Sequence, residues 1–211
     1  MSSPSDWAPT PPAAGPLAGP ELLERAVGYT RTSLMLVGTA DLTARTPCAD
    51  WDLLRLLRHM NDSLAAFTEA AEIGYVDLVP VRADPGTHPI EEPAPELVEG
   101  LVEALKQRAC ALLSAWTHHP GPGPVGVADR ELRSDLVAAA GALEIAVHGW
   151  DVAQACGVDR PLPPGLALEL LDVLPLLVDA ADRPARFAEP VDVPLHARPS
   201  SRLLAALGRR S

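Results

Sequence analysis

The stretch ALEIAVHGWDVAQA, residues 142–155, reads as the middle of an apolar helix that carries three polar side chains along one line. At about 100° per residue, Glu144, His148 and Asp151 fall within about 40° of that line, and the other residues on it are small or apolar. Side chains four residues apart on a helix stand one above the other, so Glu144 and His148 can reach the same ion. The pattern predicts a helix that faces a cavity inside a bundle.

The same spacing has a simpler explanation. A glutamate and a histidine four residues apart are also common on exposed helix faces, where water solvates both and no metal is needed. Four apolar residues favour the metal site, because they lie together beside the polar line and place it at the edge of the core or inside it: Leu136, Leu143, Val147 and Trp150. A glutamate in such a place needs a cation, a partner or water.

Apolar residues recur at helical spacing along most of the chain, with almost no strand pattern. Residues 1–19 are rich in Pro, Ala, Ser and Gly, and we expect a flexible tail there. Residues 20–211 are expected to form a single domain. The predicted helices cover residues 21–37, 51–72, 95–119, about 129–156, 164–181 and 201–210.

The connections between these helices complete the predicted fold. Asp50 is the expected N-cap of the second helix, and Gly74 is expected to end it. The Pro-rich and acidic residues 79–95 are expected to form a long loop, and Pro175 to interrupt the fifth helix. The fold class that follows is all-α: a four-helix bundle with a long crossover loop and extra C-terminal helical segments.

Composition narrows the class of partner. A formal charge of −11 and a pI near 4.9 oppose binding to nucleic acid or to an anionic membrane. The most apolar run, residues 164–181, contains acidic residues and a proline, which argues against a membrane span. Cys48, Cys110 and Cys156 are far apart, as in reduced cytoplasmic proteins. We expect a small-molecule substrate, no nucleic acid and no membrane, and leave a homodimer open.

A metal would need a third donor from another helix, and His59 is the best candidate. It lies roughly 110° from the centre of the apolar face of the second helix, at the boundary between core and surface. That position suits a side chain at the mouth of a pocket, and equally an ordinary surface histidine. The other histidines end a helix or stand beside prolines and are weaker candidates: His88, His118, His119 and His196.

Two segments, TPCADWDLLRLLRHM (46–60) and LEIAVHGWDVAQA (143–155), resemble the DinB-like bundle family that includes mycothiol-dependent maleylpyruvate isomerase. The closing segment RFAEPVDVPLHARPSSRLLAALGR (186–209) is similar to the tail of an actinobacterial subgroup of that family. The resemblance implies a DinB-like bundle and one divalent metal, usually zinc. It also implies the ligands, a histidine of the second helix and a Glu-x-x-x-His pair of a later one, which here are His59, Glu144 and His148.

Three protein ligands leave a coordination position open, as in catalytic zinc sites. The resemblance implies that mycothiol or another small thiol binds there as a thiolate and acts in transfer or isomerisation. Asp151 is expected to orient a ligand imidazole, with a salt bridge to Arg55 or Arg58 as the alternative. Two other functions stay open: a metal-activated hydrolase, lyase or cyclase, and a bundle that binds a ligand without catalysis.

Two further expectations concern the limits of the resemblance. Maleylpyruvate isomerases carry an additional C-terminal domain that contributes to their active site, and the residues after the bundle are too few to form it. The metal ligands are therefore expected to carry over to this chain, but the isomerase reaction is not. The cysteines are expected to serve in packing and not as the nucleophile. Cys156 lies about 120° from Glu144 on the helical wheel, and Cys48 precedes its helix as a small buried side chain.

Overall fold

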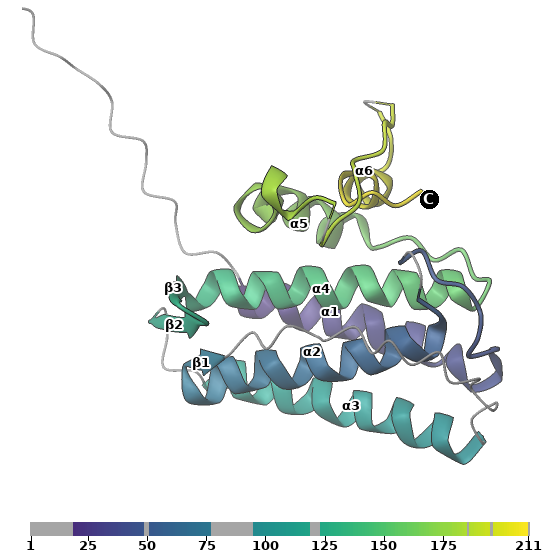
Figure 1. The fold of residues 1–211 in the computed structure, drawn as a ribbon, viewed down its shortest axis with the longest axis horizontal. Coiled ribbons are helices and arrows are strands. Elements are labelled where there is room, and N and C mark those ends of the chain that lie inside the picture. The colour runs from purple at the N-terminus through teal and green to yellow at the C-terminus, as the bar shows by residue number, and fades with distance from the viewer. Residues whose placement is uncertain are drawn as a thin grey trace, which may run out of the picture.

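The computed structural model describes residues 19–48, 51–76, 95–118, 123–184, 186–194 and 196–210. Four long helices pack side by side: α1 (Gly19–Leu34), α2 (Leu53–Ile73), α3 (Pro95–His118) and α4 (Ser134–Ala155). Figure 1 shows α5 (Pro164–Leu177) and α6 (Pro199–Ala206) outside this bundle, on the side of α4. Two short 3-10 helices are η1 (Val37–Thr39) and η2 (Ala180–Asp182). The predicted all-α bundle with extra C-terminal helices is confirmed.

The helix α4 is the centre of the structure. It packs on α1, α2 and α5, and most of its side chains are buried. It approaches α1 closely at Gly149, where a Cβ atom would lie 2.3 Å from Oγ1 of Thr30. The same Thr30 hydroxyl donates a hydrogen bond to the backbone oxygen of Ile145 at 2.8 Å. A glycine and a threonine thus hold two helices at close range.

Within the described residues, α4 is the one helix long and apolar enough to cross a membrane, judged by length and composition alone. Its most apolar window is 83% buried inside the protein. A helix that is apolar all round needs other elements on every side, and α1, α2 and α5 supply them here. This arrangement is typical of a core helix.

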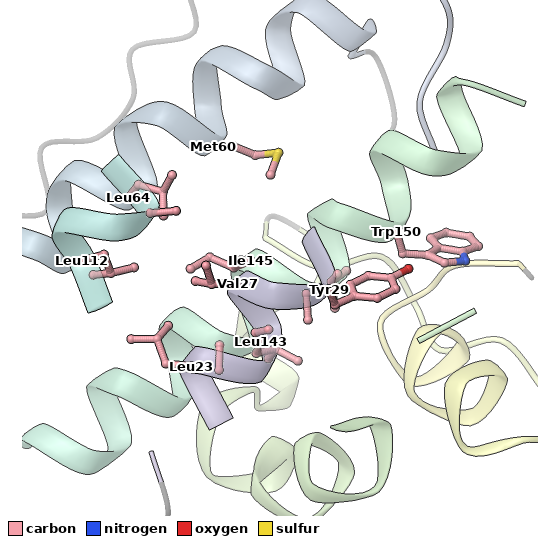
Figure 2. Close-up of a cluster of buried hydrophobic side chains, with 14 of the residues drawn as sticks. Leu23, Val27, Tyr29, Met60, Leu64, Leu112, Leu143, Ile145 and Trp150 are labelled. Atoms are coloured by element: carbon pink, nitrogen blue, oxygen red, sulfur yellow. The ribbon is translucent and has the colours of Figure 1, made fainter. Parts of the chain in front are cut away.

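The apolar core joins all four long helices. Figure 2 shows Leu23 and Val27 of α1, Leu64 of α2, Leu112 of α3 and Ile145 of α4 in this core. Full burial of a side chain of this size contributes about 1.5–3 kcal/mol to folding. The core therefore fixes α2 against α4, and with them the polar side chains that each helix carries at its edge.

A small sheet at one end of the bundle (Figure 1) corrects the expectation of almost no strands. The strand β1 (Tyr75–Val76) pairs in parallel with β2 (Pro124–Val127), and β2 pairs antiparallel with β3 (Arg130–Arg133). Consequently α4 begins at Ser134 and not near Asp129, because residues 130–133 belong to the sheet.

The start of α2 differs from the prediction. Asp52 is the N-cap, and its carboxylate accepts a hydrogen bond from the backbone N–H of Arg55 at 2.8 Å. Asp50, the expected cap, lies outside the described residues, as does the predicted loop 79–95 apart from its last residue. Gly74 ends the helix as predicted, with a left-handed φ of 71°.

The C-terminal helices are shorter than predicted. The helix α5 ends at Leu177, and the carboxylate of Asp179 then caps the next short helix by accepting a hydrogen bond from the N–H of Ala181. Pro175 lies in the last turn of α5. The closing helix α6 covers residues 199–206 where 201–210 was expected. Arg183 fastens α6 by donating a hydrogen bond to the backbone oxygen of Ala206 at 2.7 Å.

Candidate metal centre

The helices α2 and α4 bring His59, Glu144 and His148 together. Nε2 of His59 lies 2.6 Å from Oε1 of Glu144, and Nε2 of His148 lies 3.2 Å from the same oxygen. One ligand atom from each residue lies within 4.8 Å of the other two. Ligand atoms of a tetrahedral zinc lie about 3.3 Å apart, since each is about 2.0 Å from the ion. Two imidazole nitrogens and one carboxylate oxygen therefore converge at metal-ligand range.

The three side chains sit at the edge of the core. His148 is 9% exposed, whereas His59 and Glu144 are 27% and 28% exposed. A solvated pair on an exposed helix face does not describe this arrangement, because His148 is buried. The partial exposure of the other two residues leaves the cluster within reach of a small molecule.

Asp151 holds the other nitrogen of the buried histidine. Nδ1 of His148 lies 2.9 Å from Oδ2 of Asp151, whose side chain is fully buried. An ionised carboxylate can only accept a hydrogen bond, so Nδ1 is the donor and Nε2 points toward Glu144. Metal-binding histidines are usually held in this way. The alternative salt bridge to Arg55 or Arg58 is wrong, because the arginine at Asp151 is Arg209.

Cys48 also belongs to this neighbourhood, and the role of simple packing expected for it is wrong. Its half-buried thiol donates to Oδ2 of Asp151 at 3.3 Å, and its sulfur lies 3.8 Å from Nδ1 of His148. Arg209 donates to the same sulfur at 3.3 Å. Cys110 and Cys156 belong to neither group of possible metal ligands in the described part of the chain.

Ser63 and Trp51 also lie at the site, although neither was among the residues predicted for it. The hydroxyl of Ser63 donates to Oε1 of Glu144 at 3.0 Å. Because Ser63 follows His59 by four residues, helical spacing alone was a signal that could have found it. The ring of Trp51 lies 4.7 Å from that of His59 and 6.3 Å from that of His148, measured between centroids, so it flanks both imidazoles.

The electrostatics of the cluster call for a positive charge. Burial opposes ionisation of Glu144, but His148 and His59 outweigh it and hold the pKa of this carboxyl well below its usual value. Burial likewise disfavours the charged form of His148, yet Glu144, Asp151 and Cys48 raise the pKa of this imidazole well above 6.5. The raised pKa of His148 favours a proton as the source of that charge in the metal-free protein, and a divalent cation could replace it.

A second group of possible ligands shares His148 and adds Cys48 and Asp151. Arg209 already supplies a cation to this group, since its guanidinium donates to both oxygens of Asp151 and to the thiol of Cys48. A metal ion placed there would be repelled by the guanidinium. Among the described residues no arginine or lysine forms an ion pair with Glu144, so His59, Glu144 and His148 fit a divalent ion better.

A small hollow of about 20 Å³, partly open to solvent, adjoins Glu144 and His148. All four long helices line it, mostly with apolar side chains such as Val27, Met60 and Leu105. Apolar walls with a few polar groups at one place are typical of small-molecule sites. The hollow has room for about one water molecule and lies directly beside the cluster.

Comparison with known proteins agrees with this geometry. The family model of the mycothiol maleylpyruvate isomerase N-terminal domain matches residues 23–153, more than half of the chain. No curated protein and no solved structure gives a significant match. The matched span contains His59, Glu144, His148 and Asp151, and ends before α5. The resemblance inferred from the sequence is thereby confirmed: the chain belongs to the family of the mycothiol maleylpyruvate isomerase N-terminal domain.

Proposed function

We propose that this protein binds one divalent ion, zinc in the first place, through His59, Glu144 and His148, and uses it to activate a small thiol for transfer or isomerisation. Mycothiol is the thiol that the family suggests. The observation that carries the proposal is the convergence of two imidazoles on one carboxylate oxygen, at 2.6 and 3.2 Å, beside an apolar hollow.

Each side chain of the site has a part in this function. His59, Glu144 and His148 would hold the divalent ion, which would supply Lewis acidity and so lower the pKa of a bound thiol. Asp151 keeps the ring of His148 in the orientation that directs Nε2 toward Glu144. Ser63 orients the carboxylate of Glu144 by donating to Oε1. The apolar side chains that line the hollow would exclude water from the part of an acceptor substrate that lies against them.

The first experiment measures the metal. Protein purified without a histidine tag should contain one equivalent of divalent ion by mass spectrometry, or take it up when soaked in zinc, manganese or nickel. A Glu144→Ala variant should lose this ion, because one of three ligands is gone. Substoichiometric metal that does not rise on soaking would overturn the proposal.

The second experiment tests the thiol by thermal unfolding of the metal-loaded protein. Mycothiol at 100 times its dissociation constant should add about 2.7 kcal/mol of stability, and the metal-free protein and Glu144→Ala should show no such gain. Binding should strengthen as pH rises toward the pKa of a free thiol, about 8.5, because coordination requires the thiolate.

The same measurement separates the alternatives. An enzyme that activates water, such as a hydrolase, lyase or cyclase, should bind the metal but show no thiol-specific, metal-dependent shift. Equal stabilisation of the loaded and metal-free forms would indicate a thiol site away from the metal. No shift with any thiol would favour the water-activating enzyme or a bundle without catalysis.

A further inference from the structure

The segment that follows α6 reaches the candidate metal centre through Arg209. Nε of this arginine donates to Oδ1 of Asp151 at 2.9 Å, and Nη2 donates to Oδ2 at 2.8 Å. The arginine side chain is 11% exposed and the aspartate is fully buried. Two parallel hydrogen bonds of this kind fix the plane of a carboxylate as well as its position.

The carboxylate that Arg209 fixes is also the one that holds His148. Oδ2 of Asp151 accepts from Nη2 of Arg209 and lies 2.9 Å from Nδ1 of His148. A carboxylate bonded only to an imidazole can rotate about its last side-chain bond, and the imidazole can turn with it. The guanidinium of Arg209, which lies outside α4, therefore sets the orientation of the His148 ring.

The same guanidinium joins parts of the chain that are far apart in sequence. Cys48 lies before α2, Asp151 lies in α4, and Arg209 follows α6, yet Nη2 of Arg209 contacts both the thiol and the carboxylate. The family match ends at residue 153, so Arg209 lies outside it. The C-terminal segment therefore adds to the centre a contact that the matched span does not contain.

We propose that Arg209 is a positioning residue of the metal centre: by clamping Asp151 it fixes the ring of His148 so that Nε2 faces Glu144 and His59. This inference rests on the proposed metal function. Lysine keeps the positive charge, but its single ammonium group cannot form the bidentate pair of hydrogen bonds. Arg209→Lys should therefore lie between the unmodified protein and Arg209→Gln in every property that reports the orientation of His148.

The test uses Co²⁺ as the probe, because its visible absorption reports the ligand geometry around the ion. Arg209→Gln should change the Co²⁺ spectrum and raise the Co²⁺ dissociation constant by about 10-fold or more, as is usual when a residue behind a ligand is lost. Arg183→Gln is the matched control, since Arg183 fastens the same C-terminal segment through the oxygen of Ala206 without touching Asp151. It should keep the unmodified spectrum and affinity.

A second readout needs no metal. The proton on Nδ1 of His148, hydrogen-bonded to Asp151, can be followed by NMR in the metal-free protein, and Arg209→Gln should shift or broaden its signal where Arg183→Gln does not. An unmodified spectrum, affinity and proton signal in Arg209→Gln would overturn the inference, as would equal changes in Arg183→Gln. If the unmodified protein binds no metal but the proton signal still depends on Arg209, the proposed function fails and the clamp stands. Should Arg209→Gln not fold, Arg209→Lys carries the same comparison.

Discussion

Gly149→Ala should destabilise the protein, whereas Gly28→Ala should stabilise it. A Cβ atom at position 149 would lie 2.3 Å from Oγ1, 3.0 Å from Cβ and 3.1 Å from Cα of Thr30. Rotating the threonine side chain removes only the first of these contacts, because the others involve atoms fixed to the backbone of α1. Gly149→Ala must therefore push α1 away from α4.

The size of the effect follows from three contributions. Overpacking of a core contact costs about 1–3 kcal/mol. The hydrogen bond from Thr30 to the oxygen of Ile145 is also lost, which costs about 1 kcal/mol. Alanine is a better helix former than glycine, which offsets about 1 kcal/mol of this loss of stability. The free energy of unfolding should thus fall by about 1–3 kcal/mol.

Gly28 is the matched control in α1, because a Cβ atom there meets nothing within 4 Å and the position is exposed. Gly28→Ala should keep the helix-forming gain and stabilise the protein by up to about 1 kcal/mol. Urea unfolding followed by circular dichroism, with a chelator present to remove metal, measures both variants. A Gly149→Ala protein as stable as the unmodified one would refute the close packing of α1 on α4.

Three further predictions concern the site and its surroundings. Glu144→Gln should leave the helical content unchanged but weaken zinc binding by at least about 10-fold in titration calorimetry, because the amide carries no charge; unchanged affinity would contradict the ligand assignment. Burial disfavours protonation of His148, but Glu144, Asp151 and Cys48 raise its pKa well above 6.5. The contribution of His148 to the stability of the metal-free protein is therefore complete below about pH 6.5 and is lost as the pH rises through that raised pKa. Zinc binding needs the unprotonated ring and should strengthen over the same range, so melting temperatures with and without zinc should diverge as pH rises; parallel curves would speak against it. Burial raises the pKa of Tyr29 to about 12, and its hydroxyl donates to the oxygen of Arg160 at 2.6 Å, so Tyr29→Phe should cost about 1 kcal/mol of stability in urea unfolding and remove the late step of the phenol titration.

The polar line on α4 could be predicted from sequence because it depends only on helical geometry. Glu144, His148 and Asp151 share one side of a single helix, and the apolar residues around them indicate burial. Placing His59 beside them required more than periodicity, since its position on α2 suits a surface residue equally well. The family resemblance supplied that step, and the match over residues 23–153 confirms the resemblance.

The strands were not predictable in the same way. The hairpin of β2 and β3 turns at Ala128 and Asp129, and Ala128 adopts a φ of 53°. Tight hairpin turns are normally marked by glycine or asparagine, which tolerate such angles, and neither residue is present in this turn. Without that mark, residues 120–124 read as a cluster of helix breakers and residues from about 129 onward as a helix.

The N-cap of α2 shows a different limit. Asp50 is the predicted cap because it directly precedes the segment that begins at Trp51, whereas the helix that forms begins two residues later, after Asp52. The choice depends on how the chain enters the helix. The backbone N–H groups of Leu53 and Leu54 donate to the oxygens of Ala44 and Leu42, which ties the first residues of α2 to the preceding loop and puts Asp52 at the cap position.

The contact between Arg209 and Asp151 lies beyond any local pattern, because 58 residues separate the two in sequence. Energetics also give little reason to expect it. Removing two charges from water costs several kcal/mol each, and a well-packed apolar pair in the same place is often as stable or more so. Such a pair is therefore weak evidence for a role in stability alone. A bidentate clamp does provide a fixed direction for the groups it binds, which apolar packing cannot, and here it fixes the carboxylate that holds His148. For this reason we propose a role for Arg209 at the candidate metal centre, beyond the contacts that hold the C-terminal segment.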